Sequence, residues 1–202
     1  MAIALIGASG NVGAHILKEL SNRGHTVTAI ARRPENIAKL PHVTARKGDI
    51  HDKNMLTSLL KGHGIVISSI RLSDSDPRLL LKSIKAAGTR RYLAVGGTGS
   101  LDVAPGIALF KATSLPEPCK TEAVKGSELL SLLQQDNDLN WTFISPSAQP
   151  LPGLRIRRPG ASRYTYLPHT SRNRISLKDV ALALVNEIES PAHHRKHLTV
   201  GY

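Results

Sequence analysis

The stretch Ile3-Ala4-Leu5-Ile6-Gly7-Ala8-Ser9-Gly10-Asn11-Val12-Gly13 decides the fold of this chain. It opens with a short apolar run typical of a buried strand and continues with three glycines at a spacing of three residues. Apolar residues then recur at helical spacing up to Gly24, and Thr26-Val27-Thr28-Ala29-Ile30 predicts a second strand. Strand, glycine turn, helix and strand within about thirty residues is typical of a dinucleotide-binding site.

Each glycine of this turn has its own physical task. Gly7 lets the chain turn sharply off the strand, Gly10 lets a pyrophosphate approach the backbone, and Gly13 lets the helix pack close to the sheet. The phosphates would then lie at the positive end of the helix dipole. The alternative is a turn that binds no ligand. We predict that five residues of the turn and the helix start bind the cofactor: Gly7, Ser9, Gly10, Asn11 and Val12.

The length of 202 residues predicts one domain spanning residues 1–202. No apolar run reaches eighteen residues, and no basic region precedes the first apolar run, so neither a membrane span nor a signal peptide is expected. The single cysteine, Cys119, excludes an internal disulfide. These features together predict a cytoplasmic protein.

The charge balance favours an anionic partner, because 27 basic residues face 15 acidic ones, a formal net charge of +12. The candidates are a phosphorylated cofactor, an anionic substrate or nucleic acid. Only 3% of residues are aromatic, which is few for stacking on single strands. Basic residues cluster only in Arg155-Ile156-Arg157-Arg158 and in the run from His193 to His197. We therefore expect the charge to serve solubility and anion attraction rather than nucleic-acid recognition.

Strand and helix patterns alternate along the whole chain. Strands are predicted at 3–6, 26–30, 43–46, 65–67, 92–95, 141–144 and 198–200. Helices are predicted from the glycine turn to Gly24, around 55–60, from Asp76 to Gly88, at 120–134 and at 177–188. This alternation predicts an α/β fold, a doubly wound parallel sheet with helices on both faces. Four prolines interrupt the pattern between 147 and 174, where we expect a region that covers the substrate.

Ligands of such sheets bind beyond the carboxyl ends of the strands, so the residues that follow each strand are candidates. An NAD-selective site usually has an acidic residue after the second strand, whereas this chain has Arg32 and Arg33. Arginine pairs with a 2′-phosphate, which predicts NADP(H); the alternative is two solvated arginines. Asp49 and Ile50, after the third strand, are predicted to contact adenine, unless Asp49 is a helix cap.

The remaining strand ends supply the other candidate residues. Four residues after the fourth strand are predicted to contact ribose and phosphates: Ser68, Ser69, Ile70 and Arg71. Gly96 and Gly97, after the fifth strand, would leave room for the nicotinamide, and Thr98 or Ser100 offers a hydroxyl near the reacting ring. Ser145 and Pro146 follow the sixth strand.

The chain resembles the atypical short-chain dehydrogenase/reductase family, in the branch called NAD(P)H-flavin reductase-like or biliverdin-reductase-B-like, which is related to NmrA-like proteins. The resemblance spans essentially the full length. It rests on the glycine turn and on Lys47-Gly48-Asp49-Ile50, Val95-Gly96-Gly97-Thr98-Gly99-Ser100-Leu101, Trp141-Thr142-Phe143-Ile144-Ser145-Pro146, Ser171-Arg172-Asn173-Arg174-Ile175-Ser176 and Leu198-Thr199-Val200-Gly201-Tyr202.

The resemblance implies a Rossmann-like domain that binds a nicotinamide cofactor and reduces flavins, quinones or related rings. By position, Arg32 resembles the residue that holds the 2′-phosphate, and Arg71 a basic residue near the cofactor. Ser100 is the best match to the active-site serine, with Gly99 as the alternative alignment. Thr98 and Ser100 are therefore the candidate catalytic residues.

The chain departs from the family pattern in two places. None of its tyrosines has lysine four residues on, so the Tyr-x-x-x-Lys pair is missing, and Cys119-Lys120 stands where many relatives have Tyr-Lys. Ser147-Ala148 stands where flavin-reducing members can carry a histidine. Alcohol–ketone chemistry is therefore not expected, whereas a flavin or quinone accepts hydride with little acid catalysis by the protein.

Two further features leave alternatives open. Cys119 next to Lys120 is either a redox group or a small structural residue. The run from His193 to His197 is either a metal site or, as we expect, a solvated loop. The sequence thus predicts an NADPH-dependent reductase without a metal; the alternative is an NADP(H)-binding redox sensor of the NmrA-like type, without turnover.

Overall fold

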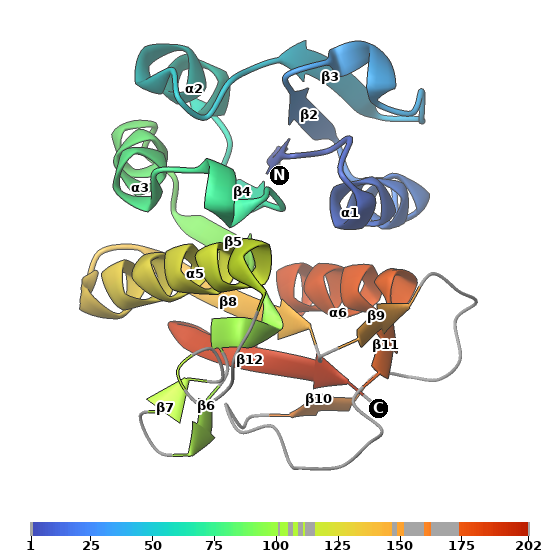
Figure 1. Ribbon diagram of the computed structural model, residues 1–202. Coiled ribbons are helices and arrows are strands. Elements are labelled where there is room, and N and C mark those ends of the chain that lie inside the picture. The colour runs from blue at the N-terminus through green and yellow to red at the C-terminus, as the bar shows by residue number, and fades with distance from the viewer. Residues whose placement is uncertain are drawn as a thin grey trace.

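A central parallel sheet organises the molecule (Figure 1). The computed structural model describes residues 2–100, 102–104, 107–108, 111, 116–146, 149–151, 160–162 and 174–201. The sheet contains β1 (Ile3–Ile6), β2 (Val27–Ala31), β3 (Val43–Lys47), β4 (Ile65–Ser68), β5 (Arg91–Val95), β8 (Asn140–Pro146), β12 (Lys196–Gly201) and β10 (Gly160–Ser162). Their order is β10-β12-β8-β5-β4-β1-β2-β3, and all neighbours run parallel except β10, which is antiparallel to β12. The predicted doubly wound sheet is confirmed.

Helices cover both faces of this sheet, as predicted. One face packs against α1 (Asn11–Asn22) and α6 (Leu177–Glu189), and the other against α2 (Lys53–Leu60), α3 (Pro77–Ala86) and α5 (Glu117–Gln135). Residues of β1 alternate between the two cores, so Ile3 and Leu5 face one helix layer while Ala4 and Ile6 face the other. Burial on both faces explains why this strand is apolar without interruption.

The ends of two helices are fixed by the side chains that the sequence indicates. The Asp76 carboxylate accepts hydrogen bonds from the backbone N–H of Arg78 and Leu79, and Pro77 begins α3. The Ser176 hydroxyl accepts from the Asp179 backbone N–H at 3.1 Å. Each N-cap satisfies donors that the first helical turn leaves unpaired.

The structure also contains smaller elements that the sequence did not predict. They are the 3-10 turns η1 (Pro34–Asn36), η2 (Leu72–Asp74) and η3 (Thr98–Ser100), and two pairs of short strands, β6 (Asp102–Ala104) with β7 (Ile107–Ala108) and β9 (Gln149–Leu151) with β11 (Arg174–Ser176). Most of the expected covering region 147–174 lies outside the described residues, as does the run Arg155–Arg158.

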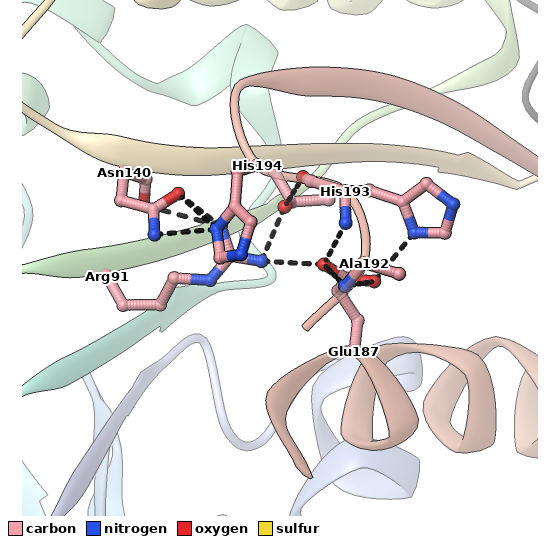
Figure 2. Close-up of polar contacts among 7 residues, drawn as sticks. Arg91, Asn140, Glu187, Ala192, His193 and His194 are labelled. Carbon is pink, nitrogen blue, oxygen red and sulfur yellow. Dashed lines mark hydrogen bonds and ion pairs between the residues drawn. The ribbon is translucent and has the colours of Figure 1, made fainter. Parts of the chain in front are cut away.

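A buried ion pair joins the amino edge of the sheet to α6 (Figure 2). Arg91, at the start of β5, donates to the Glu187 carboxylate at 2.8 Å and to the Thr142 hydroxyl at 2.6 Å. The other Glu187 oxygen lies 2.7 Å from His193 Nδ1. Burial lowers the pKa of Arg91 below its ordinary value, while the Glu187 carboxylate opposes that shift. This network lies at the edge opposite the glycine turn.

The histidine run is the predicted solvated loop only in part: His194 and Arg195 are exposed in a turn, whereas His193 and His197 are half-buried. His193 is half-buried against Glu187, and His194 contacts Asn140. His197 is in β12, with its ring edge-on to Phe143 at 5.2 Å between centroids. Within the described ranges no group of three or more His, Cys, Asp or Glu side chains is placed to hold a metal ion.

Candidate cofactor site

The glycine turn after β1 has the conformation that a dinucleotide site needs. Gly7 has a φ of +83°, and a Cβ there would lie 2.2 Å from the Ser69 carbonyl oxygen. A Cβ on Gly13 would lie 2.1 Å from the Gly7 carbonyl oxygen. Both positions therefore require glycine, for the turn and for the close packing of α1.

The amino end of α1 offers free donors to an anion. Gly10 is its N-cap, no side chain caps the helix, and its first turn holds no acidic residue. A Cβ on Gly10 would lie 3.3 Å from the Gly7 carbonyl oxygen, which is tighter than most Cβ contacts, so this position also favours glycine. Unpaired N–H groups at a helix start favour a phosphate.

A cavity of about 280 Å³ lies beside this turn, at the carboxyl ends of β1, β2, β3 and β4. Nine of the predicted cofactor-binding residues line it: Gly7, Ser9, Gly10, Arg32, Asp49, Ile50, Ser69, Ile70 and Arg71. The structure thus brings together residues from four strand ends that are far apart in the sequence. The site fits an elongated phosphorylated ligand.

Two exposed arginines line this cavity, together with two acidic residues, Asp49 and Asp74. Arg32 follows β2, Arg71 follows β4, and neither forms an ion pair with any residue that the structure describes. The loop that carries Arg71 is held by Glu122 of α5, whose carboxylate accepts from the backbone N–H of Leu72 at 2.9 Å and of Ser73 at 2.7 Å. Sequence reasoning missed Glu122 because it is 50 residues away from the loop.

Asp49 does not cap α2, which removes the alternative role considered for it. The cap is Asp52, whose carboxylate accepts from the Met55 backbone N–H at 2.9 Å. Asp49 accepts from the His51 backbone N–H at 3.0 Å through one oxygen and faces the cavity. His51 and Asp74 also line the cavity and were missed, because only residues directly after the strands were considered.

Eight of the residues predicted to bind cofactor do not line the cavity: Asn11, Val12, Arg33, Ser68, Gly96, Gly97, Ser145 and Pro146. Ser68 is the last residue of β4, and its buried hydroxyl lies 2.6 Å from the Tyr92 hydroxyl. Its predicted contact with ribose is therefore wrong for the side chain. Val12 packs against the core, whereas Asn11 and Arg33 are exposed outside the cavity lining.

The carboxyl ends of β5 and β8 form a second group of predicted residues. A Cβ on Gly96 would lie 2.1 Å from the Phe143 ring, so packing against that ring requires this glycine. The contact with Phe143 explains this glycine by packing, and its place near the nicotinamide stays a prediction. Gly97, by contrast, has no described atom within 4 Å of a Cβ.

The hydroxyl groups at this end are already hydrogen-bonded. Thr98 Oγ1 donates to the Pro146 carbonyl oxygen at 3.2 Å. Ser100 is buried, and its Oγ donates to the Gly97 carbonyl oxygen at 2.9 Å and lies 3.2 Å from Ser145 Oγ. Ser145 and Pro146 were expected after the sixth strand, but both belong to β8 and are buried.

The residues at which the chain departs from the family pattern are only partly described. Cys119 and Lys120 are exposed in the first turn of α5, and Lys120 lies 3.6 Å from Glu117. Leu101, Ser147, Ala148, the tyrosines 164, 166 and 202, and Ser171–Asn173 lie outside the described residues.

Comparison with known families decides the identity of the site. Residues 7–191 match the family model described as NAD(P)H-binding. The chain belongs to this NAD(P)H-binding family. The match contains the glycine turn and every strand end that lines the cavity, and this family member carries an NAD(P)H-binding, oxidoreductase-like fold.

Individual relatives agree with this assignment. The protein "Uncharacterized protein YwnB" of Bacillus subtilis is 32% identical, over 99% of this chain and 98% of its own length. A solved structure named a "putative epimerase" from Bacteroides thetaiotaomicron is 35% identical, covers 100% of this chain and 96% of its own, and has a TM-score of 0.90. One named a "putative NADH-flavin reductase" from Streptococcus pneumoniae is 30% identical, covers 100% and 99%, and has a TM-score of 0.80.

No helix in the described part of the chain is both long and apolar enough to cross a membrane.

Proposed function

We propose that this chain is an NADPH-dependent reductase that transfers hydride to a flavin, a quinone or a similar conjugated acceptor. The observation that carries the proposal is Arg32, an exposed cation without an ion-pair partner among the described residues, on the cavity that also contains the glycine turn. We further propose that residues 1–202 form one domain and that 147–174 cover the acceptor.

The cavity residues support NADPH over NADH. An acidic residue after β2 would repel a 2′-phosphate, whereas the Arg32 guanidinium pairs with one. The backbone of Gly7, Ser9 and Gly10 would hold the pyrophosphate, and Asp49 would accept a hydrogen bond from the adenine amino group. Arg71 would add positive charge near the phosphates.

The chemistry left to the protein favours a conjugated acceptor. Bound NADPH supplies the hydride. The chain has no Tyr-x-x-x-Lys pair, and the described hydroxyls at the end of β5 are those of Thr98 and Ser100. An extended ring delocalises the added electrons and therefore needs little acid catalysis.

The names of two relatives give competing expectations. The Streptococcus pneumoniae protein is named for flavin reduction, which supports the proposal. The Bacteroides thetaiotaomicron protein is named for epimerisation, which regenerates the cofactor and leaves the total NADPH unchanged. Net consumption of NADPH with an added acceptor therefore separates the two.

The proposal is tested by Ser100→Ala with flavin as acceptor. We expect turnover to fall about ten- to a hundred-fold, because a lost hydrogen bond in the transition state removes about 1–3 kcal/mol. Lys120→Ala is the control, since this exposed lysine pairs with Glu117 at the surface, and it should change turnover much less. Equal losses in the two variants would argue against a role for Ser100.

A second candidate function is a redox sensor that binds NADP(H) without turnover. Ser100 favours it, because its hydroxyl is buried and donates to the Gly97 carbonyl oxygen rather than facing a ligand. The sensor predicts tight NADPH binding together with no oxidation of NADPH by any acceptor.

A further inference from the structure

Three side chains form a continuous hydrogen-bonded chain that leads away from Ser100. Ser145 Oγ lies 3.2 Å from Ser100 Oγ and 2.9 Å from His197 Nε2. Ser145 is in β8 and fully buried, and His197 is in the neighbouring strand β12, where it pairs with Phe143, two residues before Ser145. Residues 45 and 52 positions apart along the chain thus meet on one face of the sheet.

The direction of this chain follows from its fixed end. Ser100 Oγ donates to the Gly97 carbonyl oxygen, which can only accept. The hydroxyl hydrogen of Ser100 is therefore used in this bond, so Ser145 has to be the donor in the hydrogen bond between the two serines. The Ser145 hydrogen is then committed as well, and His197 Nε2 has to carry a proton. His197 Nε2 therefore donates to Ser145, Ser145 donates to Ser100, and Ser100 donates to the Gly97 carbonyl oxygen.

The far end of the chain is next to solvent. His197 lines a surface cavity of about 340 Å³, together with Trp141 of β8 and the exposed residues Arg195 and Lys196. The end of α5 contributes Gln134, Asp136 and Asn137. Burial lowers the pKa of His197 to about 4, so its ring is neutral near pH 7 and has one nitrogen free to accept a proton.

We propose that Ser145 and His197 form a proton relay that resupplies Ser100 from solvent through this cavity. The inference rests on the proposed reductase function, because reduction of a conjugated acceptor consumes one proton besides the hydride. The Ser100 hydroxyl rotates from the Gly97 carbonyl oxygen and gives its hydrogen to the acceptor. Ser145 passes its hydrogen to Ser100, and His197 Nε2 passes its proton to Ser145.

The proton count then closes at the histidine. Water delivers one proton to His197 Nδ1, so the protein gains one proton from solvent and gives one to the reduced acceptor. His197 is left with its proton on Nδ1 and returns to the Nε2–H form by exchange with water after product release. Ser145 and His197 act through Ser100 and do not themselves touch the acceptor.

The first test needs no catalysis. Long-range proton–nitrogen NMR of the unliganded chain with ¹⁵N-labelled histidine reports which ring nitrogen of His197 carries the proton; His197→Gln assigns the signal. We expect a neutral ring protonated on Nε2 near pH 7. A ring protonated on Nδ1 would overturn the relay, because Nε2 would then have to accept from Ser145.

The second test measures turnover and its solvent deuterium isotope effect. Ser145→Ala interrupts the chain, and His197→Gln keeps a donor for Ser145 but cannot relay. Each should lower kcat about tenfold and raise the isotope effect, while the Kd for NADPH stays within about twofold. Imidazole should restore turnover of His197→Ala. His194→Ala is the matched control, because His194 is an exposed histidine outside the hydrogen bonds that join Ser100, Ser145 and His197. This variant should behave like the unmodified protein.

The outcomes separate the relay from the reductase itself. If the unmodified chain reduces an acceptor while Ser145→Ala and His197→Gln keep its kcat and isotope effect, the relay is overturned and the reductase stands. If none of the tested acceptors supports NADPH oxidation by the unmodified protein, the proposed reductase function is wrong and the proposed relay is wrong with it.

Discussion

The Arg91 guanidinium and the Glu187 carboxylate form a 2.8 Å hydrogen-bonded ion pair at the amino edge of the sheet (Figure 2). Their side chains are only 10% and 5% exposed. The pair connects β5 to α6 across 96 residues, and the same carboxylate accepts from the backbone N–H of His193 at 2.9 Å. It therefore fixes the segment that leads into β12, the strand that carries His197.

Glu187→Gln should lower the free energy of unfolding by about 3–5 kcal/mol, because it leaves the Arg91 charge buried without its counter-charge. The matched control is Glu189→Gln on the same helix. Glu189 pairs with Arg23 and His25 at the surface, so that change should lower it by about 1 kcal/mol or less. Urea unfolding measures the free energy of unfolding of both variants. Similar decreases would show that the buried ion pair stabilises the protein no more than the surface pair does.

Arg32→Glu should weaken NADPH binding by about 1–3 kcal/mol, because the 2′-phosphate loses a charge-assisted partner and gains a like charge. NADH binding should change much less. Arg33→Glu is the control, since Arg33 is equally exposed but does not line the cavity. Fluorescence titration gives the dissociation constants, and equal constants for NADPH and NADH in the unmodified chain would refute the predicted preference.

Adjacent glycines at the end of β5 should respond differently to alanine. Gly96→Ala drives a methyl group into the Phe143 ring and should lower the free energy of unfolding by about 1–3 kcal/mol. Gly97→Ala meets no described atom within 4 Å, so stability should change little while NADPH turnover falls, because the methyl group occupies the proposed nicotinamide position. Unchanged turnover in Gly97→Ala would place the nicotinamide elsewhere.

His197 should make the chain less stable as the pH falls. Its pKa drops from 6.5 to about 4 on folding, so the unfolded chain binds more protons between these values and stability rises with pH across that window. Relative to His197→Gln, the unmodified chain should lose about 2–3 kcal/mol between about pH 7 and pH 4.5. Parallel curves of unfolding free energy against pH for the two proteins would contradict the burial of a neutral ring.

The carboxylates are the same in both proteins, so their contributions to the pH dependence of stability cancel in that comparison. Asp136, for example, is partly desolvated, but its bonds with Lys85 and with the backbone N–H of Leu139 and Asp138 lower its pKa below the ordinary value of 3.8. Its contribution is therefore lost only at more acidic pH, outside the window in which His197 titrates.

Local sequence patterns were sufficient to predict the main helices and strands and about half of the residues of the candidate cofactor site. The spacing of Gly7, Gly10 and Gly13 has a short-range cause, a turn followed by a helix start, and it predicted both the turn and the cavity beside it. Arg32 and Asp49 were placed correctly on the cavity lining because parallel strands end at one common edge.

Contacts between residues that are distant in the sequence could not be predicted from local sequence patterns. The need for glycine at position 96 comes from Phe143, and the burial of Ser68 comes from its bond to Tyr92. The antiparallel edge strand β10 lies in a proline-interrupted region without clear alternation. In each case the deciding partner lies in another element, at a separation that no periodicity encodes.

The most direct test of the central claim is stopped-flow absorbance of NADPH with a panel of acceptors: flavins, quinones, simple ketones and aldehydes. The account predicts net NADPH oxidation with flavin or quinone and much slower oxidation with ketones and aldehydes, because positioning alone supplies most of the barrier lowering asked of the protein. Tight NADPH binding without oxidation by any of these acceptors would contradict it and would leave the sensor as the function of this chain.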